Sequence, residues 1–309
     1  VSIIAKYGSW FGDVVYLGVL VFFVISGFLI PSLMMRARET TGTISLKRFY
    51  LRRVLRIFPA FYAFILILVI AVWLGAIHLT GRDFAFALTY TVNYVPSPPW
   101  RMGHLWSLSI EEQFYLLWPL TLLVLREHRA LTVAVAAIFA GPLVRVAIRE
   151  WLFHVDPHSL SGMTKSFPAM FDYLATGCAL ALLRPWLLTR AWYLRLTASR
   201  WLALAIPLAL LINRIGNHTT AILFGSPVMN VCIALLIESG TRHAGSLVGR
   251  FLNSKPMVFL GVVSYSLYLW QQLFLDYQSK AWPDAFPQNL VFAFRAALTS
   301  HFLSERPVL

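Results

Sequence analysis

Long apolar runs recur along the whole of this 309-residue chain, and most approach the length of a membrane-crossing helix. A bilayer core is crossed by about 20 consecutive apolar residues. The expected spans cover approximately residues 14–35, 57–77, 104–125, 130–148, 167–183, 201–213, 221–237, 256–275 and 289–303. They are too evenly spread for one anchor attached to a soluble domain. The sequence therefore predicts an all-α, multi-pass integral membrane helical bundle of nine spans, with residues 1–309 as a single domain.

One expected span contains two adjacent carboxylates. It includes the stretch HLWSLSIEEQFYLLWP, residues 104–119. At about 100° per residue, one narrow sector of this helix carries a stripe with Glu112 on its flank. The stripe consists of His104, Ser107, Glu111, Tyr115 and Trp118. A charge within a span costs roughly 2.5–3.5 kcal/mol, so the stripe predicts a functional interior. The alternative is a structural carboxylate that pairs with an arginine of another span.

Small residues in the first span predict close helix packing. Gly18, Ser26 and Gly27 lie within YLGVLVFFVISGFLI, and such residues let two helix backbones approach each other. The chain opens with VSIIA, which resembles the tail of a separate apolar helix that precedes this span.

Composition supports this class of protein. Hydrophobic residues make up 59% of the chain and charged residues 13%, and the mean hydropathy is +0.69. The formal net charge is +13, but the basic residues gather in short segments between apolar runs. This is the positive-inside pattern of membrane proteins, so we expect membrane lipid and no nucleic acid as partner. It also predicts a cytoplasmic C-terminus.

The strongest basic segment precedes the second expected span. If RRVLRIFP is helical, Arg52, Arg53 and Arg56 project within an arc of about 100° and can converge on one anion. Guanidinium groups match the geometry of phosphate oxygens. Two alternatives stay open, because the same residues serve equally well as determinants of topology or as ligands of lipid headgroups.

A second polar face is expected late in the chain. Within SYSLYLWQQLF, Tyr265, Tyr268 and Gln272 share one side of a helix, flanked by Ser264 and Gln271. This side is a candidate substrate path. Hydrogen bonding between helices alone is an equally good interpretation.

No metal site is expected. His154, Asp156 and His158 form an HVDPH trio in an expected outer loop over residues 149–166, but Pro157 interrupts them and no suitable ligand pair stands nearby. A second outer loop is expected over residues 80–102.

The five segments YLGVLVFFVISGFLI, RRVLRIFP, HLWSLSIEEQFYLLWP, SYSLYLWQQLF and SERP occur in the order found in a known family. Together they resemble the membrane-bound acyltransferase 3 family, which includes bacterial O-acyltransferases of surface polysaccharides and macrolides. The resemblance implies a multi-pass protein of the bacterial cytoplasmic (inner) membrane. It also implies transfer of an acyl group, expected to be acetyl, from acyl-CoA to a hydroxyl of a carbohydrate, a lipid-linked glycan or a glycosylated small molecule. Acyl-CoA would be a co-substrate, and no permanently bound cofactor is expected.

The resemblance also implies roles for residues. Arg53 and Arg56 match the family's paired arginines, and with Arg52 they would hold the phosphates of CoA. His104, Glu111 and Glu112 are the candidate catalytic residues. The candidate substrate path comprises Ser107, Tyr115, Tyr265, Tyr268 and Gln272. His104 can act as base if the acceptor reaches the outer end of its helix; alternatively, Glu111 or Glu112 orients a histidine from another helix.

Two departures from the family accompany the resemblance. Full family members carry ten spans, with an arginine and a catalytic histidine on a first helix, and no such pair precedes YLGV here. We therefore expect an N-terminally truncated sequence with no appended soluble domain. Gln271 and Gln272 stand where many members have a histidine. A proton-coupled secondary transporter and an inactive truncated relative are the competing interpretations.

Overall fold

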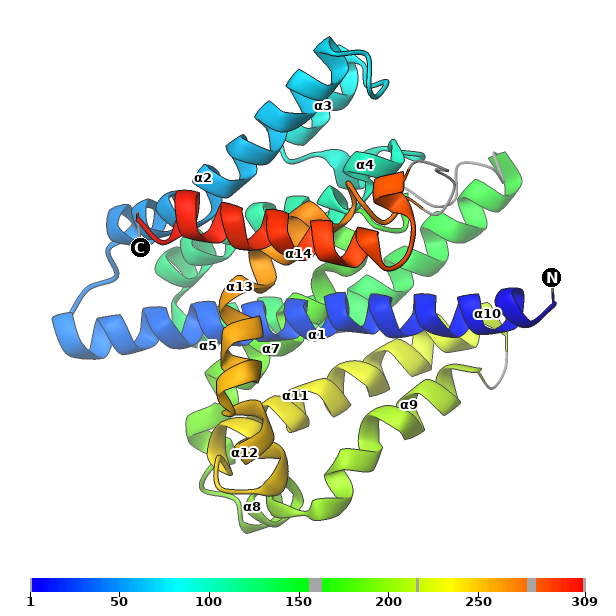
Figure 1. Cartoon of the computed structure of the whole chain (residues 1–309). Coiled ribbons are helices and arrows are strands. Elements are labelled where there is room, and N and C mark those ends of the chain that lie inside the picture. Colours follow the sequence, from blue (N-terminus) through cyan, green and yellow to red (C-terminus); the bar gives the residue numbers. More distant parts are fainter. Residues whose placement is uncertain (1, 156–162, 215–216, 277–281, 308–309) are drawn as a thin grey trace. The chain divides into compact units, whose positions relative to one another are not determined.

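The chain divides into two compact units, whose boundaries cut through one long helix. The structure, a computed structural model, describes residues 2–155, 163–214, 217–276 and 282–307 (Figure 1). Unit 1 comprises Val1–Ile44 and Ile110–Ala244, and unit 2 comprises Ser45–Ser109 and Gly245–Leu309. Within the described part of the chain every regular element is helical, which confirms the all-α fold class.

Unit 1 contains most of the long helices. They are α1 (Ser2–Thr41), the part of α5 (Leu105–Val155) from Ile110 onward, α7 (Phe167–Leu187), α8 (Ala191–Ala198), η3 (Arg200–Leu204), α9 (Ala205–Arg214), α10 (His218–Thr220), η4 (Ala221–Gly225) and α11 (Ser226–Arg242). Figure 1 shows α9 and α11 side by side.

The closest packing in unit 1 joins α1 to α7. A Cβ atom added to Gly27 would lie 1.9 Å from the carbonyl oxygen of Leu174, and one added to Gly177 would lie 2.1 Å from that of Val24. Glycine is thus required on both sides of this contact. The prediction of close packing is confirmed for Gly27 but was wrong for Gly18, around which no atom lies within 4 Å of an added Cβ.

Unit 2 contains the remaining helices. They are α2 (Leu46–Trp73), α3 (Gly81–Leu88), η1 (Val92–Tyr94), α4 (Trp100–Gly103), the start of α5, α12 (Leu247–Leu252), α13 (Lys255–Gln271), η5 (Trp282–Asp284), α14 (Gln288–Ser300) and η6 (His301–Glu305). Local sequence sets several ends: Ser45 caps α2, and Thr80 forms a capping box with Asp83 at the start of α3.

Fewer helices pass a test of length and apolar composition for a membrane span than the sequence pattern predicts. Within the described ranges, four helices are long and apolar enough to cross a membrane, or five if the bent pair Ala191–Ala198 and Arg200–Leu211 forms one span. The bend in this pair is 63°. The chain is therefore a multi-pass membrane protein, and the count of nine spans stays a prediction.

The predicted basic turn REHR is a real break in α5. Arg126 has φ 61° and ψ 175°, which interrupts the helical backbone between the spans expected over residues 104–125 and 130–148. The expected outer loop over residues 149–166 was wrong in its first part, because α5 continues to Val155.

Two other boundaries differ from expectation. The basic segment before the second span belongs to the helix itself, since α2 begins at Leu46 and not near residue 57. The residues VSIIA were expected to end a separate helix, but from Ser2 onward they continue without a break into α1. Run length measures the apolar part of a helix, whereas backbone hydrogen bonding continues into the polar turns beyond it.

Candidate active site

His104 lies at the junction between the short helix α4 and α5, in unit 2. The sequence VPSPP cannot continue a helix and ends the preceding segment. The junction is tied to the loop after α13, because Arg101 donates to the carbonyl of Leu273 over 2.9 Å and Gln272 Nε2 donates to that of Trp100 over 2.8 Å. His104 itself is only 6% exposed.

The two nitrogen atoms of the His104 ring have different surroundings. Nε2 lies 3.0 Å from the carbonyl oxygen of Leu269. A carbonyl oxygen only accepts hydrogen bonds, so Nε2 carries the hydrogen of the neutral ring and Nδ1 carries the lone pair. Nδ1 is buried and has no hydrogen-bond partner among the described residues. The ring is further held by edge contacts with Phe64 and Tyr268. A histidine in this state can accept a proton from a substrate.

The polar face of α13 packs against this junction. The hydroxyl of Tyr268 donates to the carbonyl oxygen of His104 over 2.7 Å and also forms a short hydrogen bond with Ser107. The hydroxyl of Tyr265 donates to the carbonyl of Ile57 over 3.0 Å. These donors thus brace helices against one another. The substrate path stays a prediction for the residues of this region, which are Ser107, Tyr265, Tyr268 and Gln272.

The candidate donor-binding arginines project from the first turns of α2. Arg52 and Arg56 are exposed and Arg53 is half-buried. These positions lie in the second and third turns of α2, beyond the capped first turn. An anion placed there could accept hydrogen bonds from more than one guanidinium group. Arg56 precedes Phe64, the neighbour of His104, by eight positions, which corresponds to about 12 Å along the helix axis.

Glu111 belongs to a separate polar cluster in unit 1. Its Oε1 atom accepts hydrogen bonds from Ser26 over 2.7 Å and from Tyr115 over 3.4 Å. Glu111 is 4% exposed, and Ser26 is equally buried. The inner stripe of the expected helix is thus buried, while Leu116, Leu117 and Leu120 on the other side are exposed. Glu112 is half-buried on the flank of this stripe.

A buried ion pair in unit 1 was not predicted from the sequence. Both terminal nitrogens of Arg145 contact the carboxylate of Asp172, over 2.6 and 2.9 Å, and Asn230 donates to the same carboxylate over 3.1 Å. Arg145 and Asp172 are charges of opposite sign within two expected spans. Each such charge needs a partner inside the bundle, so their signs alone could have predicted the pair.

A second missed cluster lies in unit 2, near the end of the chain. Glu305, from the SERP segment, accepts a hydrogen bond from Ser266 of α13 and lies 3.1 Å from Nδ1 of His301. All three side chains are buried. The contact connects η6 to α13, so two of the segments that carry the family resemblance meet in this unit.

Among the residues that the structure describes, no group of three or more histidine, cysteine, aspartate or glutamate side chains could hold a metal ion. His154 lies at the end of α5, whereas Asp156 and His158 lie outside the described residues. Cys178 and Cys232 are free thiols.

Membrane-crossing helices with a buried polar interior define the chain as a polytopic membrane protein. The acyltransferase domain of the acyltransferase 3 family matches residues 3–303. The chain therefore belongs to this family, as its motifs indicated. No solved structure matches it at a significant level.

Curated proteins similar to this chain include several that are named as O-acetyltransferases. YrhL of Bacillus subtilis (strain 168), provisionally named a peptidoglycan O-acetyltransferase, is 30% identical over 82% of this chain and 43% of its own length. The peptidoglycan O-acetyltransferase OatA of Listeria monocytogenes is 29% identical over 82% of this chain and 44% of its own length. SACOL0978 of Staphylococcus aureus (strain COL), provisionally named an O-acetyltransferase, is 28% identical over 93% of this chain and 50% of its own length. The chain thus spans about half the length of the curated relatives it matches.

Proposed function

We propose that the chain is the membrane-embedded part of an O-acyltransferase, which moves an acetyl group from acetyl-CoA to a carbohydrate hydroxyl. The observation that carries the proposal is the hydrogen bonding of the buried His104. Its Nε2 is hydrogen-bonded to the carbonyl oxygen of Leu269, whereas its Nδ1, the basic nitrogen, has no hydrogen-bond partner among the described residues. Membership of the acyltransferase 3 family supports the reaction class. The names of the relatives support a glycan acceptor, with peptidoglycan as the first candidate.

In the proposed reaction Nδ1 of His104 removes the proton of the acceptor hydroxyl as its oxygen attacks the thioester carbonyl. A carbon–oxygen bond forms and the carbon–sulfur bond breaks. The leaving thiolate of CoA then takes the proton from the imidazolium, which restores the neutral ring. General base catalysis of this kind contributes about 10²–10⁴-fold to the rate.

The donor would bind in the same unit, with its phosphates at Arg52, Arg53 and Arg56. The three guanidinium groups supply the charge for these phosphates. The distance of about 12 Å along α2 between Arg56 and the level of Phe64 leaves room for an extended linker between phosphate and thioester. By the positive-inside rule this end of α2 faces the cytoplasm, where acyl-CoA is made.

Location and topology belong to the same proposal. A multi-pass protein with basic segments on one side would lie in the bacterial cytoplasmic membrane with its C-terminus inside. The acyl group would then enter from the cytoplasmic face, and a glycan acceptor would approach His104 from the opposite face.

The test is acetyl transfer by the chain reconstituted in proteoliposomes, with radiolabelled acetyl-CoA and a soluble muropeptide as acceptor. His104→Gln is the decisive variant, because the glutamine amide can still donate to Leu269 but provides no base. We expect a loss of about 100-fold or more in turnover for His104→Gln. His78→Gln, at an exposed histidine of the same unit, is the matched control and should retain activity.

Each other outcome has a defined meaning. Full turnover by His104→Gln would overturn the role of His104. No acetyl-CoA consumption by the unmodified chain, together with solute uptake driven by a proton gradient, would support the competing transporter function. Neither activity would support an inactive relative.

A further inference from the structure

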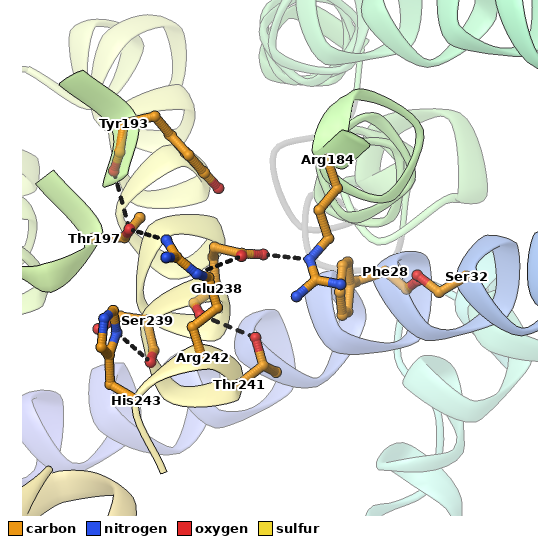
Figure 2. Close-up of polar contacts among 10 residues, drawn as sticks. All are labelled: Phe28, Ser32, Arg184, Tyr193, Thr197, Glu238, Ser239, Thr241, Arg242 and His243. Atoms are coloured by element: carbon orange, nitrogen blue, oxygen red, sulfur yellow. Dashed lines mark hydrogen bonds and ion pairs between the residues drawn. The ribbon is translucent and has the colours of Figure 1, made fainter. Parts of the chain in front are cut away.

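A cluster of charged side chains in unit 1 lies apart from all residues used above. It consists of Arg184 of α7, Tyr193 and Thr197 of α8, and Glu238 and Arg242 of α11, and we call it the α7–α11 arginine cluster (Figure 2). The span expected over residues 167–183 ended just before Arg184. In the structure α7 continues to Leu187, so Arg184 is presented from a helix.

Glu238 is the only acid among these residues and is fully buried. Its Oε2 accepts a hydrogen bond from Nε of Arg184 over 2.8 Å. Nε of Arg242 lies 3.9 Å from its Oε1, too far for a hydrogen bond, and Nη1 of Arg242 donates to Thr197 over 3.0 Å. The two guanidinium groups and one carboxylate leave one net positive charge, held partly out of water.

Unpaired hydrogen-bond donors outnumber unpaired acceptors in this cluster, in which Oε1 of Glu238 also has no hydrogen-bond partner among the described residues. Neither terminal nitrogen of Arg184 has a hydrogen-bond partner among the described residues. The hydroxyl of Tyr193 has none in the same part of the chain, although the residue is only 2% exposed. Figure 2 shows the Tyr193 ring extending from α8 toward Glu238 and the arginines. A buried hydroxyl without an acceptor costs about 1–3 kcal/mol. Oε1 of Glu238 alone cannot accept from Tyr193 and from both terminal nitrogens of Arg184, so a further acceptor is expected in use.

The cluster is also accessible to a ligand. The side chains of Arg184 and Arg242 are 36% and 26% exposed. Arg190, Arg195 and Arg200, in the same stretch of α7 to η3, are all exposed and add positive charge around it. Such a field concentrates anions near the cluster.

We propose that the α7–α11 arginine cluster binds a phosphate group, with Arg184, Arg242 and the hydroxyl of Tyr193 as donors. Several oxygen atoms on one anion match several donors from three helices, and planar guanidinium groups favour phosphate. The phosphate has two sources, the headgroup of an anionic phospholipid or a soluble phosphate compound. The site does not depend on acyl transfer, and it lies in a different unit from Arg52, Arg53 and Arg56.

The test uses Tyr193→Phe, which removes only the unpartnered hydroxyl. If the cluster is merely structural, this variant is neutral or slightly stabilising. If it binds phosphate, the variant weakens binding by about tenfold, the effect of one hydrogen bond to a charged group. Tyr62→Phe, at an exposed tyrosine, is the matched control, and Arg190→Gln controls for a general loss of positive charge.

Two measurements distinguish the sources of the phosphate. Thermal unfolding of the chain in neutral detergent is titrated with inorganic pyrophosphate, and native mass spectrometry counts lipids kept after purification from nanodiscs of phosphatidylglycerol or phosphatidylcholine. A shift by pyrophosphate that Tyr193→Phe reduces supports a soluble ligand. Retention of phosphatidylglycerol that Tyr193→Phe reduces supports a lipid. Binding in neither experiment, or binding that Tyr193→Phe and Arg184→Gln leave unchanged, overturns the proposal.

Discussion

The hydroxyl of Ser26 donates a 2.7 Å hydrogen bond to Oε1 of Glu111, although 85 positions separate the two residues. This bond joins α1 to α5 within unit 1 and lies close to Gly27, where α1 meets the backbone of α7. A buried carboxylate that accepts hydrogen bonds from two hydroxyl groups is held in one orientation. Two adjacent residues of α1 thus make two different contacts: Ser26 binds α5 through Glu111, and Gly27 packs against the backbone of α7.

Replacing Glu111 with Gln tests whether its charge matters for the reaction. In the alternative in which Glu111 orients a catalytic histidine, Glu111→Gln should abolish acetyl transfer because the charge that stabilises the imidazolium is lost. The protein should still insert and fold, since glutamine keeps the size of the side chain and can still accept from Ser26. Transfer and thermal unfolding are measured on the same reconstituted sample. The control is Ser26→Ala, which removes the hydrogen bond but keeps the charge of Glu111. It should reduce acetyl transfer less than Glu111→Gln does. Retained transfer by Glu111→Gln would remove Glu111 from the mechanism.

The arginines of α2 are expected to act on binding of the donor and not on the chemical step. Arg56→Gln or Arg53→Gln should raise KM for acetyl-CoA by about tenfold with little change in kcat, since a contact made equally in ground and transition states affects KM alone. Lys47→Gln removes one charge from the opposite side of the same helix and should leave KM nearly unchanged. An equal effect of Lys47→Gln would show that only the net charge of this segment matters.

Replacing either of two glycines of α1 with alanine should have opposite effects on stability. Gly27→Ala should destabilise the protein by about 1–3 kcal/mol or prevent folding, because the new methyl group overlaps the Leu174 carbonyl and backbone cannot move aside easily. Gly18→Ala should be neutral or stabilising by up to about 1 kcal/mol, since alanine favours helix and no atom obstructs it. Detergent-solubilised thermal unfolding measures both. Equal behaviour of the two variants would contradict the close packing of α1 and α7.

Features that depend on neighbouring residues in the chain could be predicted from the sequence. The all-α membrane class follows from run length, and the break at Arg126 follows from the basic turn REHR. The helix boundaries were less accurate, since α2 and α5 extend several residues beyond their apolar runs.

Features that depend on packing could not be predicted from the sequence in the same way. Helical periodicity placed His104 and Glu111 on an inner face, but it does not say which helix packs against that face. The contact of His104 with Leu269 and the contact of Glu111 with Ser26 thus required the structure. The contact of Glu238 with Arg184 was not predicted, because a single acid at the end of an apolar run does not indicate which basic residue lies near it.

The buried pair Arg145 and Asp172 provides a test of how unit 1 is held together. Asp172→Asn leaves the Arg145 charge buried without its counter-ion, and the loss of one partner from such a pair costs about 3–5 kcal/mol. The double variant Arg145→Met with Asp172→Asn removes both charges and should recover most of this loss, because the introduced asparagine can still bond to Asn230. Arg38→Gln breaks the exposed pair with Glu127 and should cost at most about 1 kcal/mol. Thermal unfolding of the unmodified chain and of these three variants gives their order of stability. A double variant less stable than Asp172→Asn would show that the ion pair itself stabilises the helices.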